Sequence, residues 1–376
     1  MENIYVMRLN KNRIVIISPN DGSDVRIGKV CRSLSAKDYD VHFIGWDRRP
    51  NVKKSIELGA VTKHIINIET HHGKFNEYLL IKFIIHIFSN LKKLKPNTVC
   101  CVDEEYALIA FLCGRFNYRY LICDVFDSLY DRHSNKNYLS RSLLMGIQYI
   151  SRYLSDLLIA TDEERYSKFG HFKSKCIVIP NYPEDPGEEL SKRTIEGPLK
   201  IYVSGTLIKT RGLDTLIKAI LHYQDIEILS AGWVYDDYAS EVFMKNQNVK
   251  YFGIITAKQS LEIASQCDGI FAYYEPISIN NIQASPNKIY DAMSVGRPVI
   301  INNEVIVSKW VTDEKIGYSA PYYDVNALVH IFDMLKHQRN QLKSYALNSR
   351  KIFSKGYSWE SVSNRLLNIY ETYRRD

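Results

Sequence analysis

The sequence predicts an α/β protein made of two doubly wound, Rossmann-like domains. Short apolar runs with strand character alternate with helix-like patterns along the whole chain, which is typical of parallel sheets joined by helices. A stretch rich in Pro, Glu, Gly and Lys, residues 180–198, interrupts this alternation as a linker does. The length of 376 residues is enough for two cores. We therefore expect one domain at 1–185 and a second at 195–356.

The composition is that of an ordinary globular protein, with 45% hydrophobic and 24% charged residues. The formal net charge of +7 suits a phosphate-bearing substrate or an anionic membrane surface, and charge alone does not choose between them. The sequence contains no nucleic-acid-binding motif and no dense basic run, so we expect no nucleic-acid partner.

The cysteines and the N-terminus indicate a cytoplasmic protein. Seven scattered cysteines form no CxxC and no Cys/His ligand spacing, which favours reduced, buried thiols. The first apolar run, Ile14–Ile17, is too short for a signal peptide, and no uncharged window reaches the roughly 20 apolar residues of a membrane span. We expect the protein in the cytoplasm or at the cytoplasmic face of a membrane.

The N-terminal half begins with a βαβ unit. The strand Ile14–Ile17 leads into a turn-rich loop at 18–24, a helix at 25–37 and a strand at 41–44. The loop lacks a GxGxxG fingerprint, so a dinucleotide cofactor is not expected. The candidate acceptor-binding residues of this unit are Gly22, Asp24 and Arg26. Arg26, early in the helix, fits a substrate anion or a surface arginine equally well.

Residues 76–95 form a strongly apolar helix with a narrow polar stripe. One interpretation is a nearly buried core helix. The other is an interfacial helix with Phe83, Ile87 and Phe88 at a membrane boundary and lysines near lipid phosphates. We favour the core, because an α/β domain must bury its helices.

A candidate base follows the strand at 120–125. A carboxylate just past the carboxyl end of a parallel strand lies where such sheets bind ligands. Asp124 and Asp127 meet this condition, and Asp127 meets it better because it lies further out in the loop. The alternative is turn chemistry, with Asp as an N-cap or in an Asx-turn.

The most informative stretch is residues 271–303, where residues typical of a helix start and a helix end bound a short helix. Ser285 suits the N-cap and Pro286 the first helical position, because proline presets φ and needs no N–H partner there. Gly296 can take the left-handed conformation that ends a helix. Buried parallel strands are expected on both sides of this helix.

The start of this helix suits an anion. Its first-turn N–H groups, from about Asn287, are unsatisfied and carry partial positive charge. Lys288 adds a full charge, and Asp291 falls on the same face one turn deeper. A cation there suits a diphosphate and the carboxylate suits a ribose diol, so we predict a nucleotide-sugar pocket. The alternative is a solvated surface ion pair.

A second strand-to-helix turn follows the strand at 199–203. Lys209 and Arg211 lie near the start of the next helix and can converge with Lys288 on a diphosphate. Taken singly, each is as well explained as a surface charge.

The C-terminal half resembles the retaining GT-B glycosyltransferases of the large family four, which includes many bacterial surface-polysaccharide enzymes. The matching segments are YVSGTLIKTRGLDTLIKAI (202–220), VKYFGII (249–255), PNKIYDAMSVGRPVI (286–300) and YSWESVSNRLLNIY (357–370). The first half matches more loosely, through SPNDGSDVRIGKVCRSL (18–34), CDVFDS (123–128) and IPNY (179–182).

The resemblance implies a GT-B fold whose two domains face a central cleft, with a final helix at about 357–376 crossing back to the N-terminal domain. It implies a metal-independent transfer of sugar from a nucleotide diphosphate to a saccharide or lipid-linked acceptor held by the first domain. Gly205 and Arg211 match the phosphate-binding turn of the family. Asp291 matches the second acid of its E-x7-E motif, the acid that holds the ribose.

The sequence departs from the family pattern at three places. The first acid of E-x7-E falls on Gln283, the arginine after the glycine is Thr206, and the usual lysine is Arg211. Lys288 is then the replacement cation. Related GT-B branches share a lysine here and use an N-domain aspartate as base, so the retaining and inverting outcomes both stay open.

We therefore predict Lys288 and Asp127 as catalytic residues, with no metal and no cofactor. The predicted donor-binding residues are Gly205, Lys209, Arg211, Gln283, Ser285, Pro286, Asn287 and Asp291. A DxD metal motif, Asp38-Tyr39-Asp40, is discarded because it joins a helix to a strand, the wrong end for a ligand. The alternatives are a non-catalytic, transferase-like binding subunit and a nucleotide-sugar epimerase of the same fold.

Overall fold

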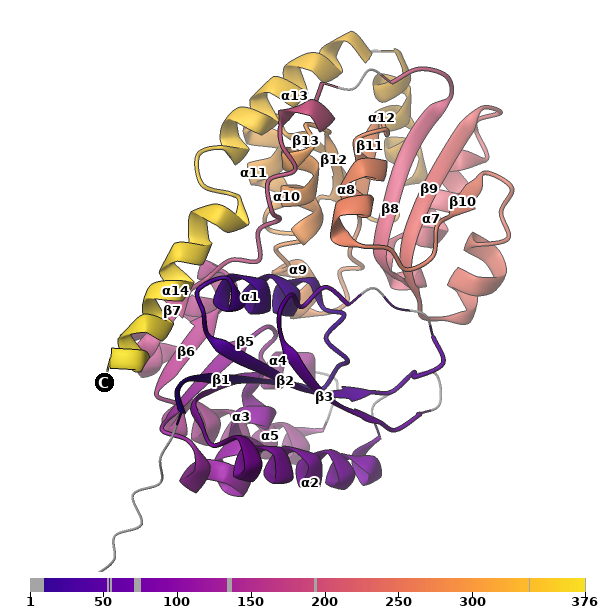
Figure 1. The fold of residues 1–376 in the computed structure, drawn as a ribbon. Helices are drawn as coiled ribbons and strands as arrows, with labels where there is room; N and C mark the ends of the chain where they lie inside the picture. Colours follow the sequence, from indigo (N-terminus) through magenta and orange to yellow (C-terminus); the bar gives the residue numbers. More distant parts are fainter. Residues whose placement is uncertain are drawn as a thin grey trace, which may run out of the picture. The chain divides into compact units, whose positions relative to one another are not determined.

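The chain divides into two compact units, residues 1–181 with 362–376, and residues 182–361. This computed structural model describes residues 10–52, 54, 56–70, 76–133, 137–192, 195–337 and 339–375 (Figure 1). Each unit contains one parallel sheet. Among the described residues, no helix combines the length and the hydrophobicity needed to span a membrane.

The first unit is built on a seven-stranded sheet in the order β3-β2-β1-β4-β5-β6-β7. Its strands are β1 Asn10–Ser18, β2 Asp40–Asp47, β3 Thr62–Asn67, β4 Pro96–Val102, β5 Tyr120–Val125, β6 Leu157–Ala160 and β7 Cys176–Val178. Its helices are α1 Val25–Ser35, α2 Glu77–Leu94, α3 Glu104–Gly114, α4 Leu129–Arg132, α5 Tyr138–Leu154 and α6 Glu163–Ser167, with short 3-10 turns at Arg115–Asn117 and Gly170–Lys175. Helices α2, α3 and α5 cover one face of the sheet and α1 lies on the other (Figure 1).

The second unit repeats this design with six strands in the order β10-β9-β8-β11-β12-β13. Its strands are β8 Leu199–Leu207, β9 Ile226–Val234, β10 Val249–Tyr251, β11 Gly269–Ala272, β12 Val299–Asn302 and β13 Gly317–Ala320. Its helices are α7 Leu213–Ile220, α8 Ala257–Ala264, α9 Ile279–Ile282, α10 Asn287–Ser294, α11 Ser308–Asp313, α12 Val325–His337 and α13 Arg339–Phe353, with 3-10 turns at Glu188–Leu190 and Lys209–Arg211 and a π-helical turn at Ala239–Phe243.

Both sheets are doubly wound. In each, the strand order reverses beside the first strand, between β1 and β4 and between β8 and β11, and ligands bind at the carboxyl ends of strands at such a switch point. One core of the second unit lies under α7 and α12, and the other lies under α8, α10 and α11. The predicted fold class is therefore confirmed.

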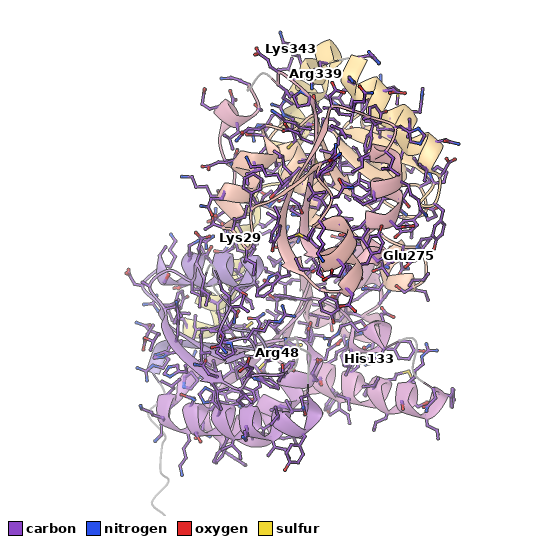
Figure 2. The ribbon with its side chains drawn as sticks, turned by 90° about the vertical axis from the view of Figure 1, so that its right-hand side faces the viewer. Lys29, Arg48, His133, Glu275, Arg339 and Lys343 are labelled. Atoms are coloured by element: carbon purple, nitrogen blue, oxygen red, sulfur yellow. The ribbon has the colours of Figure 1, made fainter. Side chains whose placement is uncertain are left out.

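Buried charge is paired where α13 meets the second sheet. Arg339, labelled in Figure 2, donates to Asp268 Oδ1 at 2.9 Å, and Asp268 is 0% exposed. The other oxygen of Asp268 accepts from the backbone N–H of Lys200 at 2.8 Å. This carboxylate therefore joins the helix to the starts of β8 and β11.

Helix α14, Trp359–Arg375, brings the chain end onto the first unit. Leu366 and Tyr370 are 1% and 2% exposed. Asn97 donates to the carbonyl of Tyr373 at 2.8 Å, and the ring of Tyr373 lies 4.5 Å from that of Tyr120. The C-terminal segment is thus part of the core of the first unit.

The structure contains two strands that were not predicted, and it tests the two interpretations of α2. β3 and β13 have no predicted counterpart, because both are edge strands that lack an apolar run. In α2 the core interpretation is confirmed for Phe83 and Ile87, both 0% exposed, so these two side chains are not available to a membrane.

Candidate functional site

Helix α10 begins one residue later than predicted. Pro286 is the N-cap, with φ −63° and ψ 126°, and no side chain caps the helix. The hydroxyl of Ser285 lies 3.0 Å from the Tyr290 hydroxyl, so it is engaged with a side chain rather than with a free N–H. The expected N-cap role of Ser285 is therefore wrong, whereas Gly296 has the expected left-handed φ of +64°.

Lys288 and Asp291 form a half-buried ion pair on α10. The ammonium donates to Asp291 Oδ2 at 2.6 Å, and the side chains are 21% and 20% exposed. Burial alone would lower the pKa of Lys288, but Asp291 outweighs it and the pKa lies above its ordinary value. Lys288 is thus charged, and the pair is mostly withdrawn from solvent, unlike the solvated surface pair that was the alternative.

Two glycines meet at the carboxyl ends of β8 and β9, and one of them, Gly205, lies beside this pair. Gly205 has φ +103°, and a Cβ placed on it would lie 3.9 Å from Lys288 Cε. Its register partner Gly232 has φ +132°, and a Cβ there would lie 1.9 Å from the Gly205 carbonyl oxygen. The approach leaves no room for a side chain at 232. Sequence reasoning missed Gly232, although a glycine ending an apolar strand was the available signal.

Arg211 presents an unpaired cation in the same unit. Its guanidinium carbon lies 3.7 Å from the centre of the ring of Tyr274, two residues after β11. Across the part of the chain that the structure describes, its buried Nη1 has no hydrogen-bond partner. Buried donors without an acceptor are costly, which favours an anion as the missing partner. Tyr274 was not predicted as a site residue.

Lys209 makes different contacts. Its backbone N–H donates to Asp236 Oδ2 at 2.9 Å, and its ammonium lies 5.2 Å from the centre of the Tyr238 ring. These contacts do not join it to the Lys288 pair. Gln283 ends α9, where its N–H donates to the Ile279 carbonyl at 2.9 Å. Donor binding by Lys209 and Gln283 stays a prediction.

In the first unit, Arg26 is structural. Its guanidinium donates twice to Asp124, at 3.0 and 2.8 Å, and once to the Ile179 carbonyl at 2.7 Å. Arg26 is 1% exposed and Asp124 is 4% exposed. Both side chains therefore have a local structural explanation, and acceptor binding by Arg26 stays a prediction.

The neighbouring loop residues shape the start of α1. Asp24 is its N-cap and accepts from the N–H groups of Arg26 and Ile27 at 2.8 and 3.1 Å, although burial raises the pKa of Asp24. Gly22 has φ +87°, and a Cβ there would lie 2.9 Å from Leu58 Cδ1. Both residues have a local structural explanation, and acceptor binding by them stays a prediction.

Asp127 is half-exposed and ion-paired. Its Oδ1 accepts from Arg165 at 2.7 Å, and its backbone N–H donates to Asp103 Oδ1 at 3.3 Å. Asp103, at the end of β4, also accepts from the Phe126 N–H at 2.8 Å. Its φ of +68° with ψ 160° is strained for a residue other than glycine, and burial holds its pKa well above the ordinary range.

Asp103 is thus a second carboxyl group at the same sheet edge, and it orients the loop that carries Asp127. Sequence reasoning missed it, although it directly follows a buried strand, which is the signal that selected Asp127.

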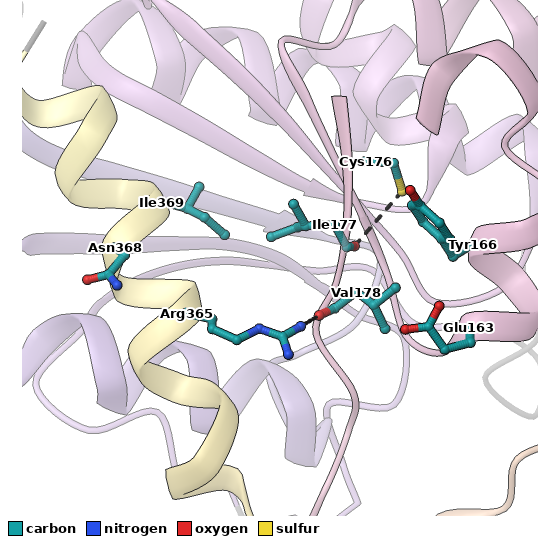
Figure 3. A pocket seen from close by; sticks show the side chains of 8 residues that line it. All are labelled: Glu163, Tyr166, Cys176, Ile177, Val178, Arg365, Asn368 and Ile369. Atoms are coloured by element: carbon teal, nitrogen blue, oxygen red, sulfur yellow. Dashed lines mark hydrogen bonds between the residues drawn. The ribbon is translucent and has the colours of Figure 1, made fainter. Parts of the chain in front are cut away.

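An open cavity of about 520 Å³ occurs elsewhere in the first unit (Figure 3). It is lined by Glu163, Tyr166, Cys176, Ile177, Val178, Arg365, Asn368 and Ile369. Arg365 donates to the Val178 carbonyl, and Glu163 adds negative charge, so the cavity does not suit a diphosphate. Within the described ranges, no cluster of three or more His, Cys, Asp or Glu side chains is placed to hold a metal ion.

Comparison with solved structures identifies the fold. Sucrose-phosphate synthase from Thermosynechococcus elongatus is 15% identical with a TM-score of 0.69, over 96% of this chain and 98% of that one. Anabaena HepE, in complex with UDP-glucose, is 12% identical with a TM-score of 0.70, over 96% and 99%. The lipopolysaccharide outer core galactosyltransferase WaaB is 12% identical with a TM-score of 0.56, over 96% and 99%.

The fold is GT-B. At these identities the likeness concerns the fold, and it confirms the GT-B resemblance predicted from the sequence motifs. No protein-family model matches the chain, and no curated protein matches its sequence. The GT-B fold places the Gly205 turn and the start of α10 at the switch point of its second sheet, between β8 and β11.

Proposed function

We propose that this protein is a glycosyltransferase that moves a sugar from a nucleotide diphosphate to a saccharide or lipid-linked acceptor. The observation that carries the proposal is the half-buried Lys288–Asp291 pair beside the Gly205–Gly232 turn, at the ligand-binding edge of a GT-B sheet. The solved structures that share the fold include HepE with UDP-glucose and the galactosyltransferase WaaB. The second of these supports a role in bacterial surface polysaccharide synthesis.

The residues of the second unit suit the parts of a nucleotide-sugar donor. Lys288, the first-turn N–H groups of α10 and the unpartnered Nη1 of Arg211 are donors for the two phosphates. Asp291 accepts hydrogen bonds and so suits the ribose diol. Because Lys288 already carries its proton, it can balance charge on the leaving diphosphate without a proton transfer.

In the reaction, the acceptor hydroxyl oxygen attacks the anomeric carbon while the bond from that carbon to the phosphate oxygen breaks. The nucleotide diphosphate leaves with the bonding electrons. We propose that protein cations stabilise this charge without a metal ion. If configuration inverts, Asp127 takes the hydroxyl proton and must exchange its ion pair with Arg165 for that contact. If configuration is retained, the leaving phosphate takes the proton.

We further propose that the protein works in the cytoplasm, at its membrane face. All seven cysteines are free, and six of them are buried, which is what a reducing compartment leads us to expect.

The test is a thermal-shift screen over common nucleotide sugars, followed by measurement of released nucleotide diphosphate. We expect one donor to raise the melting temperature, and nucleotide diphosphate to appear only when an acceptor is added. Conversion of the donor to a new sugar without acceptor would instead indicate an epimerase. Tight donor binding without turnover for any acceptor would indicate a binding subunit. No shift with any donor would overturn the proposal.

A further inference from the structure

One face of the first unit carries an unusual amount of exposed apolar surface. Helices α2, α3 and α5 lie side by side on one face of its sheet (Figure 1). Of the 24 large hydrophobic side chains that are exposed in the described parts of the chain, 13 belong to these helices and the 3-10 turn that follows α3. We call this surface the three-helix face.

Helix α5 shows that the face is unpartnered rather than poorly packed. A helix on a solvated surface directs polar residues outward. On α5, every residue with an exposed side chain is apolar or glycine, including Leu139, Leu143 and Tyr153 at 79%, 67% and 67% exposure. Its two buried residues are polar, Ser151 and Arg152, and Arg152 pairs with the buried Glu104 at 2.7 Å.

Helix α2 contributes a second apolar stripe. Phe83, Ile87 and Leu91 point into the core. A separate row, Ile81, Ile85 and Phe88, is exposed, although the core is already filled. A row of apolar side chains that lies outside the core indicates a surface that binds an external partner.

The fully exposed charged side chains that the structure describes on these three helices are basic. Lys82, Lys92 and Lys93 on α2 are exposed. The acidic residues of the three helices are Glu77, Glu104 and Glu105, and the last two are paired, Glu104 with Arg152 and Glu105 with Arg132 at 2.8 Å. The basic side chains therefore face outward next to the apolar rows with little opposing charge.

We propose that the three-helix face docks onto a membrane that contains anionic lipids. Exposed leucine, isoleucine and phenylalanine side chains can enter the acyl boundary, tyrosines suit the headgroup level, and lysines suit lipid phosphates. A second protein copy would bury the same apolar rows, but it would bring two basic surfaces together, which is unfavourable. The net charge of +7 favours the anionic lipid in the same way.

The test is flotation of the full chain with vesicles of phosphatidylcholine alone and of an equimolar mixture with phosphatidylglycerol. We expect the protein to float with the mixed vesicles and to bind less at high salt, because salt screens the lysines. The variant L139E/L143E is expected to lose about tenfold or more of its vesicle partition, since two leucines no longer enter the acyl region. The variant K92E/K93E is expected to lose binding to mixed vesicles selectively.

Controls separate docking from folding and from dimerisation. Leu347 on α13 is 75% exposed in the other unit, so L347E is expected to float as the parent chain does. If L139E/L143E melts at a lower temperature than the parent chain, the milder variant Y153S is used to test docking instead. Y153S should also reduce flotation. If the parent chain floats with neither kind of vesicle, the proposal is overturned. A dimer in light scattering that L139E/L143E converts to a monomer would also overturn it.

Discussion

Three cationic side chains differ in how many of their hydrogen-bond donors already have a partner within the protein. Arg26 donates to two carboxylate oxygens and a carbonyl and is 1% exposed. Arg211 is stacked on Tyr274 and keeps one buried nitrogen without a partner. Lys288 has a carboxylate partner and is partly exposed. Only the last two have hydrogen-bonding capacity for a ligand anion, and both belong to the second unit.

The first prediction concerns Lys288. In the variant Lys288→Ala, donor turnover should fall by about an order of magnitude or more, because a fixed cation next to the leaving diphosphate is lost. The rate of nucleotide diphosphate release measures this. Lys309→Ala is the matched control, since Lys309 forms a comparable but exposed pair with Asp313 at 2.6 Å. Equal rates for a folded Lys288→Ala and the parent would remove Lys288 from the site.

The second prediction concerns the buried pair of the first unit. Asp124→Ala should destabilise the protein by about 3–5 kcal/mol, because Arg26 is left charged and buried without its carboxylate. Urea unfolding measures the difference. Asp214→Ala breaks an exposed pair with Lys218 and should cost well under about 1 kcal/mol. A cost at Asp124 as small as at Asp214 would contradict the structural role.

At the scale of elements, the glycine pair sets the shape of the β8 and β9 ends. Gly232→Ala should abolish donor binding, because its Cβ would overlap the Gly205 carbonyl. Gly253→Ala is the control, because Gly253 also has a positive φ, +77°, but a Cβ there meets nothing within 4 Å. Donor-induced thermal shift measures both variants. The idea fails if Gly232→Ala binds donor as well as Gly253→Ala does.

A histidine contact joins β2 to β3. His42 Nδ1 lies 2.9 Å from His64 Nε2, and burial lowers the pKa of both. The charged groups that act on them are Asp40, Arg13, His86 and Lys93. A histidine whose pKa is lower in the folded state than in the unfolded state is more stable there in its neutral form. Its contribution to the free energy of unfolding is therefore complete above the unfolded pKa of about 6.5. That contribution is lost as the pH falls below this value.

The melting temperature should fall between about pH 7.5 and about pH 5.5, because the unfolded chain binds more protons there. The double variant H42N/H64N should show a smaller fall over the same interval. Thermal unfolding at both pH values measures the difference between parent and variant. An unchanged pH dependence in the double variant would assign the effect to other groups.

At the scale of the whole molecule, the last helix closes the first core. Leu366→Ala should destabilise the protein by about 2–5 kcal/mol, because the side chain is 1% exposed against the first sheet. Urea unfolding measures the loss, with the exposed Leu347→Ala as control. If the two variants unfold alike, α14 is not part of that core in solution.

Sequence alone determined the two doubly wound domains, because strand and helix periodicities are local patterns. It also placed Lys288 and Asp291 on one helix face, since a spacing of three residues is set within one turn. Only the tertiary structure decided that Arg26 forms its ion pair with Asp124, 98 residues away, and that Gly232 lies opposite Gly205 in the sheet. Such pairings depend on strand order and register, and the local sequence around each residue does not encode them.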